Sequence, residues 1–183
     1  FIMTTLEELG LLKMDFLGLR TLTVIQNAVL LARRKQPELN INQIDYNDQK
    51  VLDYIGTGKT DGVFQLESAG MKGFMKELKP HNLEDVIAGI SLYRPGPMDF
   101  IPQYIRGKND SSSITYDCPQ LEPILAPTYG CIVYQEQVMQ IVRDLAGYSL
   151  GRSDLLRRAM SKKKAAVMEK ERKIFIYGDE ETG

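Results

Sequence analysis

Apolar residues recur at helical spacing along most of the chain. Within residues 19–37, Leu22, Ile25, Val29 and Ala32 fall on one stripe of a helix. Similar patterns predict further helices over residues 47–56, 68–80, 82–93, 98–108, 136–148, 153–160 and 164–178. The expected N-cap residues are Asn47, Ser68, Asn82 and Ser153.

The stretch LLKMDFLGLR alternates apolar and polar side chains instead. As a strand, it would point Leu12, Met14 and Phe16 toward a core and present Lys13 and Asp15 side by side on the other face. Shorter runs at residues 61–67, 114–117 and 131–135 also have the character of strands. We therefore expect a mainly α fold with a few short β-strands.

Two interpretations of Lys13 and Asp15 are open on the residues alone. The pair is typical of a salt-bridged edge strand whose outer face is half exposed. The less common alternative is a site in which Asp15 binds a metal ion and Lys13 contacts the anion that the metal carries.

Charge is distributed unevenly over the 183 residues, whose net charge is −1. The segment 152–173 holds nine basic and three acidic residues, a net charge of +6, which leaves −7 for the remainder. This asymmetry indicates a polyanionic partner near one end. The composition, 43% hydrophobic and 26% charged, is that of a globular protein without a membrane-spanning run.

The two cysteines, Cys118 and Cys131, have neither metal-ligand spacing nor a disulfide-rich setting. Because no export signal precedes them, a reducing cytoplasm is the expected compartment. The chain begins without Met and stops without a terminal element, so we expect a piece of a longer protein.

The segment LGRSDLLRRAMSKKK combines an apolar helix face with a basic one. Arg157 and Arg158 lie opposite the apolar side chains, and Lys162–Lys164 follow. Arginine forks suit phosphate oxygens, so the segment favours a triphosphate or a nucleic-acid backbone, although a solvated basic face has the same pattern. Arg94, before a Pro-Gly-Pro corner, either caps the preceding helix or is fixed in a site.

Five blocks occur in the order KMDFLGLRTLT, GVFQLESAGM, SLYRPGPM, PTYGCIVYQEQVMQI and AGYSLGRSDLLRRAMSKKK. Together they strongly resemble the alpha subunits of bacterial DNA polymerase III, the family C replicative DNA polymerases, from about Leu11 to about Tyr177. The resemblance implies that residues 1–20 form the C-terminal edge of the palm domain, including its last strand. It also implies that residues 21–183 form part of the fingers domain.

The resemblance also implies roles for particular residues. Asp15 would be a catalytic, metal-coordinating aspartate of a two-metal Mg²⁺ site that residues outside this chain complete. Lys13 would contact the nucleotide triphosphate. Arg157 and Arg158 would bind the triphosphate. Two weaker assignments are also implied, Arg94 for the triphosphate and Lys162, Lys163 and Lys164 for DNA.

The implied activity is template-directed addition of deoxynucleotides to a primer 3′ end by two-metal phosphoryl transfer, with this piece inactive alone. The implied partners are primer–template DNA, deoxynucleoside triphosphates and, through regions absent here, the sliding clamp and other replisome subunits. No membrane partner is expected, and the implied location is the bacterial cytoplasm at the nucleoid. The rival interpretations are a non-catalytic helical nucleic-acid-binding module and a purely structural domain.

Overall fold

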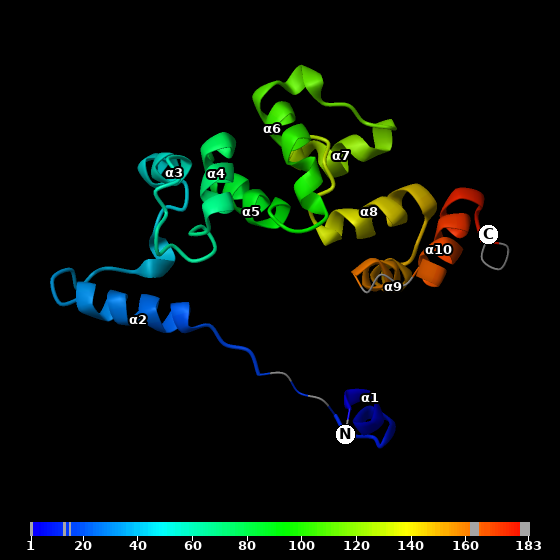
Figure 1. Cartoon of the computed structure of the whole chain (residues 1–183), viewed down its shortest axis with the longest axis horizontal. Coiled ribbons are helices and arrows are strands. Elements are labelled where there is room, and N and C mark those ends of the chain that lie inside the picture. The colour runs from blue at the N-terminus through cyan, green and yellow to red at the C-terminus, as the bar shows by residue number, and fades with distance from the viewer. Residues whose placement is uncertain (1, 13, 15, 162–164, 180–183) are drawn as a thin grey trace. The chain divides into compact units, whose positions relative to one another are not determined.

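The regular secondary structure is entirely helical in the part of the chain that the computed structural model describes, which is residues 2–12, 14, 16–161 and 165–179 (Figure 1). The chain divides into two compact units, Phe1–Asp45 and Tyr46–Gly183. No helix in the described ranges is long and apolar enough to cross a membrane.

The first unit is small and has little interior. Its elements are α1 (Met3–Glu8), α2 (Arg20–Ala32) and the 3₁₀ turn η1 (Ile41–Gln43). The predicted helix around residues 19–37 is confirmed as α2, but α2 buries none of its residues. Its apolar side chains, among them Leu22 and Leu31, remain exposed.

The second unit holds the remaining helices, joined by short turns. They are α3 (Gln49–Gly56), α4 (Ala69–Leu78), α5 (Leu83–Leu92), η2 (Pro97–Phe100), α6 (Ile101–Asn109), η3 (Ser111–Ser113), η4 (Pro119–Leu121), α7 (Glu122–Leu125), η5 (Ala126–Thr128), α8 (Gln135–Ala146), α9 (Leu150–Ser161) and α10 (Ala165–Tyr177).

Side-chain caps start several of these helices. Ser68 and Asn82 cap α4 and α5, as the sequence predicts, by accepting hydrogen bonds from the backbone N–H groups three residues later. The cap of α3 is Asp48 and not the predicted Asn47. Asn47 instead accepts a hydrogen bond from the backbone N–H of Leu83 at the start of α5.

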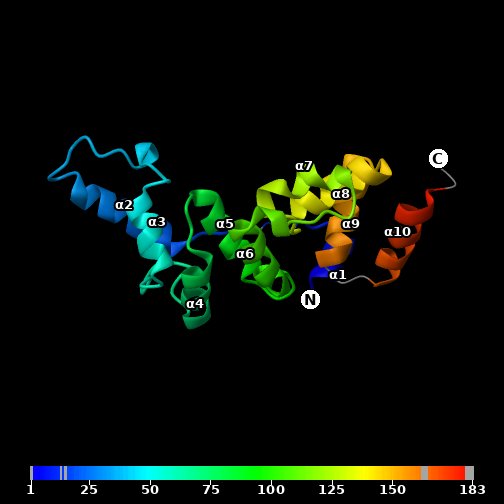
Figure 2. The ribbon, with the colours of Figure 1, turned by 90° about the horizontal axis from the view of Figure 1, so that it is seen from above.

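The main core lies between α4, α5 and α6. The members of this cluster that are most completely buried include Met75, Leu78, Leu92 and Tyr104. A second apolar cluster joins α8 to α9 and α10 through Val142, Tyr148 and Leu156. Figure 2 shows α8 and α9 lying against each other, as the packing of this cluster requires. The second cluster therefore positions α9 and α10, which carry the basic residues of segment 152–173.

The expected β-strands are wrong, because no strand occurs among the residues that the structure describes. Residues 61–67 form turns, with Gln65 in the left-handed region at φ 65°, where no strand residue lies. Around residues 131–135, the backbone N–H groups of Val133 and Tyr134 donate to the side chain of Gln137. Since these groups are occupied, they cannot pair with a neighbouring strand.

The predicted palm strand is also not seen. The described residues between 9 and 19 adopt no strand, and the side chains of Leu12, Met14 and Phe16 are 81%, 68% and 92% exposed. The core face expected for these three residues is therefore not seen. The division into palm and fingers domains at residue 20 stays a prediction.

Candidate functional site

Helix α9 carries the two adjacent arginines. Gly147, at φ 67°, ends α8 in the left-handed conformation that favours glycine, and the chain then turns into α9. On α9, Leu156 and Ala159 are buried, as predicted, whereas Leu155 and Met160 are exposed. The buried apolar face of α9 is thus narrower than the sequence suggests.

Arg157 is held by contacts from two helices. Its Nε and Nη2 atoms donate to Oδ1 of Asp154 at 2.9 and 2.7 Å. Its Nη1 atom donates to Oε1 of Gln135, the first residue of α8, at 2.8 Å. A carboxylate and an amide therefore fix the plane of this guanidinium group before any ligand is present.

Arg158 is held more loosely by the same carboxylate. Its Nη2 atom lies 2.7 Å from Oδ2 of Asp154, and its side chain is 62% exposed, compared with 29% for Arg157. The hydrogen bond from Arg157, and then the positive charge of Arg158, lower the pKa of Asp154. At neutral pH the three side chains carry a net charge of +1, with the N–H donors of Arg158 turned largely to solvent.

Sequence reasoning found the two arginines but missed the residues that hold them. Asp154 precedes Arg157 and Arg158 by three and four positions, a spacing that places ion-pair partners together on a helix. That signal was available in the sequence. Gln135 lies 22 residues before Arg157, and only the packing of α9 on α8 brings the two together. The predicted cap Ser153 is instead buried inside α9, where its hydroxyl donates to the carbonyl of Ser149.

Arg152 has a different role from the other basic residues of this segment. Its Nε lies 3.2 Å from Oε2 of Glu171, and its Nη1 lies 2.7 Å from Oδ2 of Asp179. The guanidinium carbon lies 4.6 Å from the ring centroid of Tyr148. These contacts tie α9 to α10 and neutralise the charge of Arg152. A pocket of about 390 Å³ beside it is lined in part by Lys170 and Lys173.

Arg94 lies at the corner between α5 and η2, and its side chain is exposed. Its backbone carbonyl accepts a hydrogen bond from Met98 at 3.1 Å, which closes the turn. Arg94 thus lies on a different element from Arg157 and Arg158, which are on α9. The joint triphosphate role predicted for the three arginines stays a prediction.

The other predicted site residues, Lys13, Asp15 and Lys162–Lys164, lie outside the described residues. Within the described part of the chain, no group of three or more His, Cys, Asp or Glu side chains could hold a metal ion. The donor set for the expected Mg²⁺ site is thus not assembled by the residues that the structure describes.

Comparison with known proteins identifies the class. Residues 21–183 match the sequence model of the bacterial DNA polymerase III alpha subunit finger domain. The chain is 52% identical over 177 residues to a DNA polymerase III subunit alpha of Halalkalibacterium halodurans, a match that covers 96% of this chain. It is 51% identical over 183 residues, or 99% of the chain, to proteins of the same name from Staphylococcus aureus strains Mu50 and N315.

The chain therefore belongs to the bacterial DNA polymerase III alpha subunit finger domain family, as the resemblance of the five sequence blocks predicts. It spans about a sixth of the length of these curated relatives, or 16–17%.

Proposed function

We propose that the chain forms the fingers of a DNA-directed DNA polymerase, and that Arg157 and Arg158 bind the triphosphate of the incoming deoxynucleotide. The observation that carries this proposal is the pairing of two adjacent guanidinium groups on α9, oriented by Asp154 and Gln135. Two guanidinium groups on neighbouring residues, of which Arg157 is fixed, are suited to several phosphate oxygens on one small ligand.

The geometry also supports an order of events. Arg158 is the more exposed of the pair and is held by Asp154 alone, so phosphate oxygens reach it first. Arg157 keeps its contact with Gln135 and serves as the fixed partner. Positive charge at this position stabilises the charge that develops on the leaving pyrophosphate during nucleotide addition.

The test is to replace Arg157 and Arg158 singly by Ala in the full-length polymerase. Removing a charge-assisted phosphate contact should raise the KM for deoxynucleotides about 10- to 100-fold and change the Kd for primer–template less than about twofold. Arg143→Ala, which removes an exposed arginine from α8, is the matched control. If the arginines bind the DNA backbone, the pattern is reversed, with weaker DNA binding and a shallower salt dependence.

We further propose that Asp15 is a carboxylate ligand of catalytic Mg²⁺ and that Lys13 contacts the triphosphate. The proposal is supported by membership of the polymerase family and by the adjacent cation and carboxylate in the sequence KMDFLG. When bound, the metal ions would neutralise charge on the reacting phosphates. Asp15 would contribute one ligand, and residues beyond this chain would contribute the others.

Asp15→Asn preserves the shape of the side chain and removes the charge that holds the metal. In the full-length polymerase, the rate of nucleotide addition should fall by at least about 10³-fold, while primer–template binding is retained. Single-turnover incorporation measured at several Mg²⁺ concentrations provides the readout. A near-normal rate in the variant would end the assignment of Asp15.

A further inference from the structure

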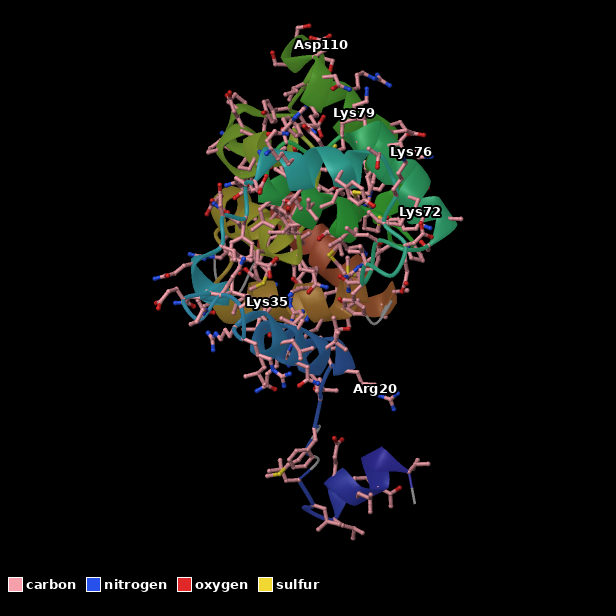
Figure 3. The ribbon with its side chains drawn as sticks, turned by 90° about the vertical axis from the view of Figure 1, so that its left-hand side faces the viewer. Arg20, Lys35, Lys72, Lys76, Lys79 and Asp110 are labelled. Carbon is pink, nitrogen blue, oxygen red and sulfur yellow. The ribbon has the colours of Figure 1, made fainter. Side chains whose placement is uncertain are left out.

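Three lysines form a row along one side of α4, well separated in the sequence from the arginines of α9. Lys72, Lys76 and Lys79, here named the lysine stripe, follow the spacing i, i+4, i+7 that places side chains one above the other on a helix. Figure 3 shows the three in order along this helix. Glu77, the acidic residue of α4, follows Lys76 directly and therefore points away from it by roughly 100° around the helix axis.

Two of the three ammonium groups are available to a ligand. Lys76 and Lys79 are exposed, and neither side chain has an ion pair among the described residues. Lys72 is half-buried and pairs with Asp61, a contact that lowers the pKa of Asp61. Exposed lysines are commonly only a solvated face, so the stripe alone decides nothing.

The backbone of Lys79 supplies the independent observation. Lys79 ends α4 in the left-handed region, at φ 45° and ψ 73°. At a helix C-terminus this conformation is strained for a residue with a Cβ atom and is usually occupied by Gly or Asn. A lysine therefore occupies a position where glycine would be more stable. The backbone conformation is held by Lys108, whose ammonium group donates to the carbonyl of Lys79, so it is the presence of lysine in place of glycine that indicates a function for the exposed side chain.

The loop before α4 packs tightly beneath the stripe. A Cβ atom on Gly58 would lie 2.7 Å from the carbonyl oxygen of Lys72 and 2.7 Å from Cε of Lys76. The backbone carbonyl of Lys72 leaves room only for glycine at this position, and φ 68° at Gly58 also favours glycine. The neighbouring Lys59 is exposed and adds a further positive charge from the same loop.

We propose that the lysine stripe binds the sugar–phosphate backbone of DNA, independently of sequence, as a contact surface separate from the arginines of α9. The stripe spans seven helical rises, about 10 Å, and one DNA strand carries a phosphate about every 3.4 Å of axis. About three phosphates therefore lie along the stripe, where Lys76 and Lys79 are free to bind them while Lys72 is paired with Asp61. A protein partner fits less well, because the centres of protein interfaces are depleted of lysine.

The first test is the salt dependence of primer–template binding by the full-length polymerase. Removing one phosphate-binding lysine should reduce the slope of log K against log salt by about 0.9. The variant Lys76→Ala/Lys79→Ala should therefore have a slope close to two units shallower and bind DNA several-fold to tens of fold more weakly near 0.15 M salt. The KM for deoxynucleotides at saturating DNA should stay unchanged, which separates this result from the test of Arg157 and Arg158.

Lys50→Ala is the matched control, since Lys50 is exposed on the neighbouring helix α3 and outside the stripe. Its DNA affinity and salt slope should equal those of the wild type. If the stripe variant also keeps the wild-type slope, the proposal is overturned; an acidic protein segment as the true partner would give this result.

The second test uses the strain at Lys79. Lys79→Gly relaxes the left-handed conformation and removes the charge, so its unfolding temperature should be equal to or higher than that of the wild type. Its DNA affinity should nevertheless fall by about three- to tenfold, as for Lys79→Ala. Wild-type DNA affinity in Lys79→Gly would show that the lysine serves only the fold, and would overturn the proposal.

Discussion

Lys108 shows how one buried charge can fix the ends of several helices. Its ammonium group donates to the carbonyls of Leu78 and Lys79 at 2.8 Å each and lies 2.9 Å from Oδ2 of Asp85. The same carboxylate oxygen accepts a hydrogen bond from the backbone N–H of His81. The side chains of Lys108 and Asp85 are 7% and 3% exposed, so each satisfies the other away from water.

Replacing Lys108 by Met should strongly destabilise this region, because it leaves the Asp85 carboxylate buried without a counter-charge. The free energy of local opening at α4 and α5 should fall by about 3–5 kcal/mol, measured by hydrogen exchange of their backbone amides in the full-length protein. Adding Asp85→Asn to this variant should restore part of the protection, since no uncompensated charge then remains. Equal exchange in wild type and Lys108→Met would contradict this account.

At the scale of single residues, the sequence predicts what local spacing determines. The caps Ser68 and Asn82 follow from positions three residues apart. The spacing of Asp154 to Arg157 and Arg158 carries information of the same kind, although it was missed. The contacts of Lys108 with α4, and of Arg157 with Gln135, join residues more than 20 positions apart. No periodicity in the sequence carries that information.

At the scale of elements, the sequence pattern identified the described helices of eight or more residues but not the short α1 and α7, and it predicted strands that are not seen. Gln137 accounts for one of these errors, because its side chain occupies the backbone N–H groups of Val133 and Tyr134 and also contacts Thr128. This buried network holds the approach to α8 in a turn. A short apolar run is ambiguous between strand and turn until such side-chain partners are known.

Close packing between elements depends on Gly107 in α6. A Cβ atom at this position would lie 2.8 Å from Cβ and 3.1 Å from the carbonyl oxygen of Tyr129, which packs edge-to-face on Tyr104. Gly107→Ala should therefore reduce the free energy of local opening at α6 by about 1–3 kcal/mol. Gly73→Ala in α4, where a Cβ atom would meet nothing within 4 Å, should instead raise the free energy of local opening at α4 by about 0.5–1 kcal/mol.

Hydrogen exchange of the α6 and α4 amides in the two alanine variants measures both effects. Faster exchange at α4 in Gly73→Ala would contradict the open space at Gly73, and unchanged exchange at α6 in Gly107→Ala would contradict the close contact of Gly107 with Tyr129.

At the scale of the whole molecule, the two units differ in how they are stabilised. Residues 46–183 contain both apolar clusters, whereas α2 in the first unit buries none of its side chains. A helix whose apolar side chains stay exposed gains little stability from burial. The curated relatives are about six times longer than this chain.

At the scale of the whole molecule, only part of the candidate site can be described. The sequence blocks identify the family, and the structure describes the arginine pair. Within the described residues, no group of three or more His, Cys, Asp or Glu side chains could hold a metal ion, so the expected Mg²⁺ site stays a prediction. Its ligands and Lys13 remain predictions for the full-length polymerase.

The most direct test of the central claim is single-turnover incorporation by the full-length polymerase with Arg157→Ala/Arg158→Ala, at varied deoxynucleotide concentration and saturating primer–template. If the pair binds the triphosphate, the Kd for the nucleotide should rise at least about 100-fold, with the Kd for primer–template within about twofold of the wild type. A wild-type nucleotide Kd, with or without weakened DNA binding, would contradict the assignment of these two arginines.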